Sequence, residues 1–81
     1  MTTLTSLSNS KLKVFGGQRE HPPPHLHLKG PNTNCTIDLA TLEPTKGHYS
    51  RSDLNEALEW LGVAENYAAA VNEWRRLNER E

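Results

Sequence analysis

One segment constrains the fold more than any other. In it, three consecutive prolines precede an alternation of histidine with leucine, and its sequence is His21-Pro-Pro-Pro-His-Leu-His-Leu28. Proline has no backbone N–H to donate to a β-ladder, so Pro22–Pro24 belong to a connection or to the first residue of a strand. Beyond them, successive side chains of an extended chain point to opposite faces. The two leucines then face a core, while His25 and His27 face away from it. This pattern predicts a β-strand over residues 24–29.

Two more segments alternate in the same way. Lys11-Leu-Lys-Val-Phe15 precedes a pair of glycines and predicts a strand over about residues 11–16. Cys35-Thr-Ile-Asp-Leu39 follows the turn-rich stretch Gly30–Asn34 and predicts a strand over about residues 35–40. Three consecutive strands with short connections favour an antiparallel meander.

After residue 49 the hydrophobic period changes from two to that of a helix. Ser50-Arg-Ser-Asp53 resembles a capping box, with Ser50 or Ser52 as the N-cap. Gly62 is a natural place for this helix to stop or bend, and a second helical run begins at about Ala64. The apolar stripes of the two runs consist of Leu54, Ala57, Leu58, Leu61, Tyr67, Val71, Trp74 and Leu77.

A chain of 81 residues has room for one hydrophobic core. Residues 1–10 are rich in Thr, Ser and Asn and are predicted to be a flexible tail, in which Leu4 and Leu7 could add a short edge strand. Residues 11–81 are predicted to form a single α+β domain. Its architecture is a three-stranded antiparallel meander followed by two C-terminal helices packed on one face, because an apolar sheet face and apolar helix stripes must cover one another.

The charge is small overall and uneven along the chain. The formal net charge is −1, with +2 on residues 1–50 and −3 on residues 51–81. This balance lacks the basic footprint of a nucleic-acid-binding protein, so nucleic acid is not expected as a direct ligand. No apolar run reaches the length of a membrane span and the N-terminus lacks the pattern of a secretion signal. We therefore expect a soluble, cytoplasmic protein with no membrane partner.

His21, His25 and His27 form the main candidate site. Imidazoles two apart on a strand can bind zinc or copper, but a metal site needs a third or fourth ligand. Further ligands would have to come from His48, Asp38 or Glu20. The same imidazoles could act as acid and base in the cleavage of a phosphodiester such as RNA, with Lys29 or Arg19 holding the anion. They could also be a polar recognition patch or solvated surface. No other cofactor is expected, and the sequence assigns no catalytic residue.

The remaining reactive and aromatic side chains have simpler interpretations. Cys35 is the only cysteine, which excludes a disulfide within the chain and a cysteine-based zinc site. Its phase with Ile37 favours a buried position over a nucleophile activated by a histidine of the neighbouring strand. Trp74 lies on an apolar stripe and is predicted to be core. Trp60 lies off the stripe and is a candidate anchor for a partner.

Five short motifs follow one another along the chain: Pro23-Pro-His-Leu-His-Leu28, Gly30-Pro31, Ile37-Asp-Leu39, Leu58-Glu-Trp60 and Asn72-Glu-Trp74. Their order resembles a family of small bacterial proteins of unknown function whose members share a Pro-Pro-His-x-His core. The resemblance covers about Lys11 to Arg76. It departs from the family pattern in a less aromatic N-terminal strand and in Gly62, which interrupts a helix that is often continuous in the family.

The resemblance implies a gene that often lies beside another small open reading frame, as in toxin–antitoxin-like pairs. We therefore predict a small protein-interaction or regulatory module, part of such a pair or a small inhibitor, rather than an enzyme. The alternative is a His-dependent metal-binding protein or an RNase-like enzyme. A thin core and a free sheet edge at the histidine-bearing strand favour a protein partner or a homodimer. The expected contact residues are His21, His25, His27, Lys29 and Trp60.

Overall fold

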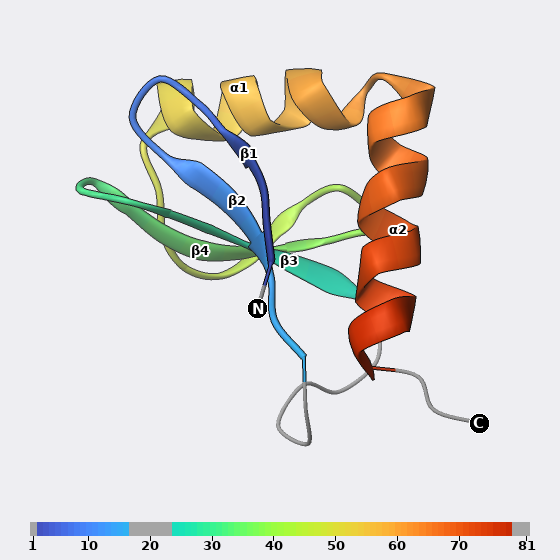
Figure 1. The fold of residues 1–81 in the computed structure, drawn as a ribbon. Helices are drawn as coiled ribbons and strands as arrows, with labels where there is room; N and C mark the ends of the chain where they lie inside the picture. The colour runs from blue at the N-terminus through green and yellow to red at the C-terminus, as the bar shows by residue number, and fades with distance from the viewer. Residues whose placement is uncertain (1, 17–23, 79–81) are drawn as a thin grey trace.

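The sheet comes first and the helices last in a computed structural model that describes residues 2–16 and 24–78 (Figure 1). The elements are β1 (Thr2–Ser6), β2 (Lys11–Val14), β3 (His25–Gly30), β4 (Thr33–Asp38), β5 (Pro44–His48), α1 (Arg51–Leu61) and α2 (Ala64–Asn78). Every neighbouring pair of strands is antiparallel, in the order β1-β2-β3-β4-β5. The predicted α+β class, the antiparallel meander and the two C-terminal helices are confirmed.

The sheet has five strands, so the expectation of three is wrong. β2, β3 and β4 are the three predicted strands. β1 lies within residues 1–10, the segment predicted to be a flexible tail, and β5 follows the loop after β4. The sequences of the two added strands are Thr-Thr-Leu-Thr-Ser and Pro-Thr-Lys-Gly-His. Neither alternates polar with apolar residues, because an edge strand can pair through its backbone while burying little, and hydrophobic periodicity then gives no signal.

The histidine-bearing strand β3 is the central strand, so the expectation of a free edge there is also wrong. The free edges belong to β1 and β5. β5 carries Pro44 and Lys46, its pairing with β4 shifts register, and Gly47 has a φ of 86°. A Cβ at Gly47 would collide with the carbonyl oxygen of Asn34, so glycine is required there. Proline, lysine and a register shift are features that keep an edge strand from pairing further.

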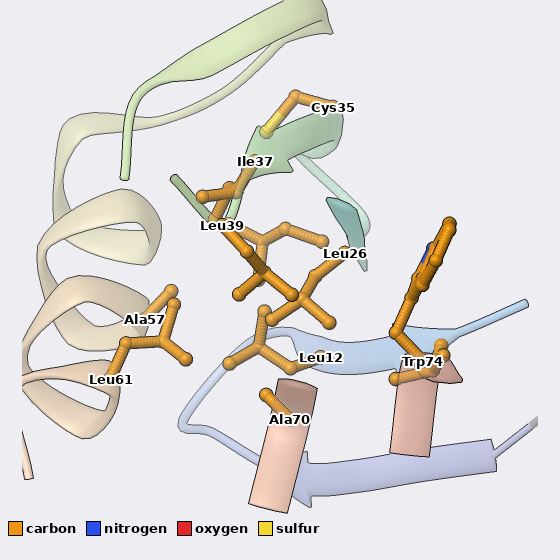
Figure 2. Packing of buried hydrophobic residues seen from close by; sticks show 11 residues of the cluster. Leu12, Leu26, Cys35, Ile37, Leu39, Ala57, Leu61, Ala70 and Trp74 are labelled. Atoms are coloured by element: carbon orange, nitrogen blue, oxygen red, sulfur yellow. The ribbon is translucent and has the colours of Figure 1, made fainter. Parts of the chain in front are cut away.

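One face of the sheet and both helices share a single core (Figure 2). Alternate residues of β2, β3 and β4 are buried, as the sequence predicts, and apolar side chains reach them from α1 and α2. The core residues are Leu12, Val14, Leu26, Leu28, Cys35, Ile37, Leu39, Ala57, Leu61, Ala70 and Trp74. The opposite face of the sheet, which we call the outer face, is left to polar side chains.

A buried polar network fastens the sheet to the start of α1. Thr33 Oγ1 donates to Asp53 Oδ2 at 2.5 Å and accepts from the backbone N–H of Ser50 at 3.1 Å. The N–H of Asp53 donates to Ser50 Oγ at 3.1 Å, so Ser50 rather than Ser52 is the N-cap. Thr33 is 0% exposed and Asp53 2% exposed, so protein groups take the place of water as their hydrogen-bond partners.

The chain breaks its helical run at Gly62, as predicted. α1 ends at Leu61, and the N–H of Gly62 donates to the carbonyl of Leu58 at 2.9 Å. Asn66 Nδ2 donates to the carbonyl of Trp60 at 3.0 Å, which ties the first turn of α2 back to α1. The two helices consequently run in different directions over the sheet (Figure 1). Among the described residues, neither helix combines the length and the apolarity that crossing a membrane requires.

A second polar contact joins β1 to α2. Thr2 Oγ1 donates to Glu73 Oε2 at 2.6 Å, and Arg76 donates to both Glu73 oxygens, from Nε at 3.0 Å and from Nη2 at 2.5 Å. The hydrogen bonds from Arg76 and then from Thr2 lower the pKa of Glu73 from its ordinary 4.5 to about 2. Because the pKa is lower in the folded state, ionised Glu73 stabilises the fold above about pH 4.5, and this contribution is lost as the pH falls towards 2.

The substitution Thr33→Val tests the buried network. Valine keeps the shape but leaves the Asp53 carboxylate without its donor and the Ser50 N–H without its acceptor, so the free energy of unfolding should fall by about 1–3 kcal/mol. Thr36→Val on the outer face of the same strand is the control and should change the stability by less than about 0.5 kcal/mol. Urea unfolding followed by circular dichroism measures both, and equal effects at the two positions would contradict a specific role for the network.

The substitution Glu73→Gln tests the contact between β1 and α2. Glutamine can still accept from Thr2 but carries no charge, so the variant should be less stable than the wild type near neutral pH. The difference should disappear as the pH falls from about 4.5 to about 2, the range over which the wild-type carboxylate is protonated. Urea unfolding at a series of pH values measures it, with the exposed Glu59→Gln as control. A difference that does not change with pH would rule out this charge effect.

Candidate functional site

The register of the strands defines the residues of the outer face. Partners in an antiparallel register project to the same side of a sheet. One row that crosses all five strands consists of Ser6, Lys11, Lys29, Asn34 and His48. The next row consists of Thr3, Lys13, His27, Thr36 and Lys46. His25 and Asp38 form a third pair on the same face. The prediction that His25 and His27 share a face directed away from the core is therefore confirmed.

Four aromatic rings meet at the end of the sheet where β3 begins. The ring centroids of Phe15 and His27 lie 4.3 Å apart, those of His25 and His27 5.3 Å apart, and those of His25 and Trp74 6.4 Å apart. We call Phe15, His25, His27 and Trp74 the ring cluster. Lys29 Nζ lies 5.5 Å from the centroid of Phe15, within the range of a cation–π interaction. The cluster thus joins three elements, β3, α2 and the end of β2.

Side chains of α2 anchor the backbone around the ring cluster. Asn78 Nδ2 donates to the carbonyl of Phe15 at 3.0 Å, and Tyr67 donates its hydroxyl to the carbonyl of Leu39 at 2.5 Å. The N–H of Leu39 donates in turn to the carbonyl of Pro24, directly before β3, at 3.0 Å. Figure 1 shows α2 passing beside the start of β3. The helix therefore fixes both backbone segments from which the rings project.

Trp74 belongs to the core and to the ring cluster at once. It is 2% exposed, so the prediction that it is buried is confirmed, and it lies beside the leucines of the sheet in Figure 2. Its ring also reaches His25 at the end of β3. The indole Nε1–H is buried and has no acceptor among the described residues. Trp74 is therefore held by apolar packing and ring contacts rather than by a hydrogen bond.

The further metal ligands considered from the sequence do not converge on the histidines. Within residues 2–16 and 24–78, no group of three or more His, Cys, Asp or Glu side chains is placed to hold a metal ion. His48 lies on the edge strand β5, two strands away from the histidines of β3. Asp38 is paired with His25, but its Oδ1 accepts from the N–H groups of Ala40 and Thr41. His21, Arg19 and Glu20 lie outside the described residues.

Two other predicted side chains lie on the opposite side of the sheet from the histidines. Cys35 is a free, buried thiol of the core, and burial raises its pKa, which disfavours the reactive thiolate. Trp60 is half-buried and packs from α1 against the core. The structure therefore brings Lys29 together with His25 and His27, but not Trp60.

Phe15 is the member of the ring cluster that the sequence reasoning missed as a site residue. The sequence pattern puts Phe15 at the end of a strand, before a glycine pair, and assigns it no functional role. Its position two residues after Lys13 was the available signal, because this spacing puts both side chains on the same face of a strand.

The substitution Trp74→Ala tests the dependence of the fold on this ring. Removing a buried tryptophan should lower the free energy of unfolding by about 3–5 kcal/mol. Tyr49→Ala, at a side chain that is 45% exposed, is the control and should cost far less. Thermal and urea unfolding followed by circular dichroism measure both variants. An unchanged melting temperature for Trp74→Ala would show that the indole serves as a surface contact instead.

Comparison with known proteins identifies the chain at the level of a family. Residues 12–75 match a family described as a domain of unknown function, DUF4160. The match spans β2 to β5, α1 and most of α2, and it leaves β1 outside. No curated protein and no solved structure matches the chain. The match contains the histidine-bearing strand, α1 and most of α2, and on this basis the chain belongs to the DUF4160 family.

Proposed function

We propose that this protein is a small interaction or regulatory module, which acts by binding a partner through the outer face of its sheet. The observation that carries the proposal is the contact between Phe15, His25, His27 and Lys29 in and beside the central strand. Ladder hydrogen bonds on both sides of β3 hold the backbone beneath these side chains. A surface that is ordered before binding loses little conformational entropy when a partner arrives.

The alternative is a His-dependent metal-binding protein or an RNase-like enzyme that cleaves phosphodiesters. The ring contacts favour recognition over ligation. An ion bound by imidazoles needs three or four ligands. The rings that contact His27 are those of His25 and Phe15, and phenylalanine has no ligand atom. Zinc or copper binding and acid–base chemistry are therefore the second candidates.

The setting that we propose is a regulatory pair of the toxin–antitoxin kind, or inhibition of a larger target. The partner would be the product of a neighbouring small bacterial gene, or a second copy of this chain. A thin core supports this proposal, because a domain of this size gains a large fraction of its stability from any partner that binds only the folded state.

The double substitution His25→Gln, His27→Gln tests the proposal. Glutamine keeps polarity and approximate size while removing the titratable ring and most of its strength as a ligand. We expect the variant to fold and to bind the product of the neighbouring small gene about tenfold or more weakly, a loss typical of contact residues that dominate an interface. Calorimetry and light scattering measure the affinity and the mass of the complex. Tyr49→Gln, which removes an exposed ring outside the five strands, is the matched control.

The same variant separates the alternatives. Unchanged affinity would remove the histidines from the contact surface. Binding of zinc or copper at about one ion per chain, lost in the double variant, would replace the proposal by a metal-binding function. Cleavage of an oligoribonucleotide, lost in the same variant, would replace it by an enzyme.

A further inference from the structure

The fold sorts the charge of the chain by face. All four lysines, Lys11, Lys13, Lys29 and Lys46, project from the outer face. Against the single acidic residue of the strands, Asp38, they leave the five strands with a net charge of +3. The two helices carry three arginines and five acidic residues, a net charge of −2. The small net charge of the chain was the reason to expect no nucleic-acid ligand. It is the sum of a positive charge on the strands and a negative charge on the helices.

No carboxylate within residues 2–16 and 24–78 forms an ion pair with a lysine of the outer face. Among residues 2–16 and 24–78, the ion pair with a carboxylate is that of Arg76 with Glu73, and none of the four lysines takes part in one. Lys11 and Lys29 are moreover direct partners in the register of β2 and β3. Like charges directly opposite each other destabilise a sheet. An anionic ligand across this pair would relieve that repulsion.

We infer that the outer face binds a single-stranded nucleic acid, with the lysines on its phosphates and the ring of Phe15 against a base. This inference goes beyond the proposed function, since it assigns to the same face a ligand other than the protein partner. Sheets that bind single strands combine cationic side chains with aromatic rings on which bases stack. The outer face has this composition, because Lys13 is the register partner of His27, and the ring of Phe15, directly after β2, contacts both His27 and the Lys29 ammonium group.

The composition of the outer face favours a nucleic acid over an acidic protein, and its shape favours a single strand over a duplex. Lysine is depleted in protein–protein interfaces, where arginine, tyrosine and tryptophan are enriched. The strands of the outer face carry four lysines and none of those three residues. A broad sheet face also suits splayed bases better than a duplex, whose major groove admits a helix or a two-stranded ribbon.

Fluorescence anisotropy with a labelled oligo(dT) of about 15 nucleotides tests the inference, since this length lies within the site sizes of single-strand-binding folds. We expect the logarithm of the association constant to fall with the logarithm of salt concentration with a slope of about −2.8, from about 0.7 per lysine–phosphate contact. Oligo(U) and a duplex of the same length are measured in parallel. Tighter binding of oligo(U) than of oligo(dT) assigns RNA as the ligand. Tighter binding of the duplex overturns the inference.

A matched pair of double variants tests whether binding depends on the lysines of the outer face or on the net charge of the protein. Lys11→Gln, Lys29→Gln removes two charges from the outer face and should reduce the slope to about −1.4. Arg51→Gln, Arg75→Gln removes two charges from exposed positions on the helices and should leave affinity and slope near those of the wild type. Equal losses in the two double variants would overturn the inference, because binding would then follow net charge alone. Urea unfolding of each variant confirms that it is folded.

The ring of Phe15 is tested by Phe15→Leu, which keeps an apolar side chain but removes the stacking surface. Binding should weaken by at least about fivefold, the loss of one stacked base. If poly-L-glutamate competes as well as the oligonucleotide and Phe15→Leu has no effect, the face binds acidic polypeptides and the nucleic-acid inference is overturned while the proposed interaction module stands. If the oligonucleotide is cleaved, the proposed function itself fails.

Discussion

The alternation of buried and outward side chains along β2, β3 and β4 is the constraint on which the rest of the structure depends. A slip of one residue in the register of β3 would bury His25 and His27 and expose Leu26 and Leu28. The cost of burying polar rings and exposing leucines therefore fixes the register, and the register fixes which side chains become neighbours on the outer face. The core and the candidate site are two sides of the same strands, and neither can be rearranged alone.

Polar contacts at the two ends of the sheet fix the positions of the helices relative to it. At one end the Thr33–Asp53–Ser50 network sets where α1 begins. At the other end Asn78 and Tyr67 of α2 hold the backbone beside the ring cluster. These contacts are few and mostly polar, so they add geometric precision to helices whose stability comes from apolar burial. The polar contacts position the site, while the core supplies most of the energy.

The sequence predicted the parts of the fold that carry a period. The three central strands, the cap at Ser50, the break at Gly62 and the burial of Trp74 all follow from local pattern or local chemistry. The edge strand β1 is predicted only as an alternative to a flexible tail, and β5 is not predicted, because both strands bury too little to alternate. The lysine face could not be predicted because it depends on strand order, which brings residues far apart in the chain into one row. The net charge of the chain does not show how charges are distributed over the surface, and its small value gave no indication of a cationic face.

The difference between the two sheet edges limits the symmetry of any assembly built by strand pairing. Both edge strands shift register against their neighbours, but β5 also carries a proline and a lysine that close its edge, whereas β1 is a run of threonine, leucine and serine with neither residue. A chain with one receptive edge cannot add subunits in both directions, so it cannot grow into an open fibre by this route. Pairing of β1 with β1 about a two-fold axis uses up both receptive edges and ends at a dimer. The strand that lies outside the family match is thus the one at which copies of this chain could join.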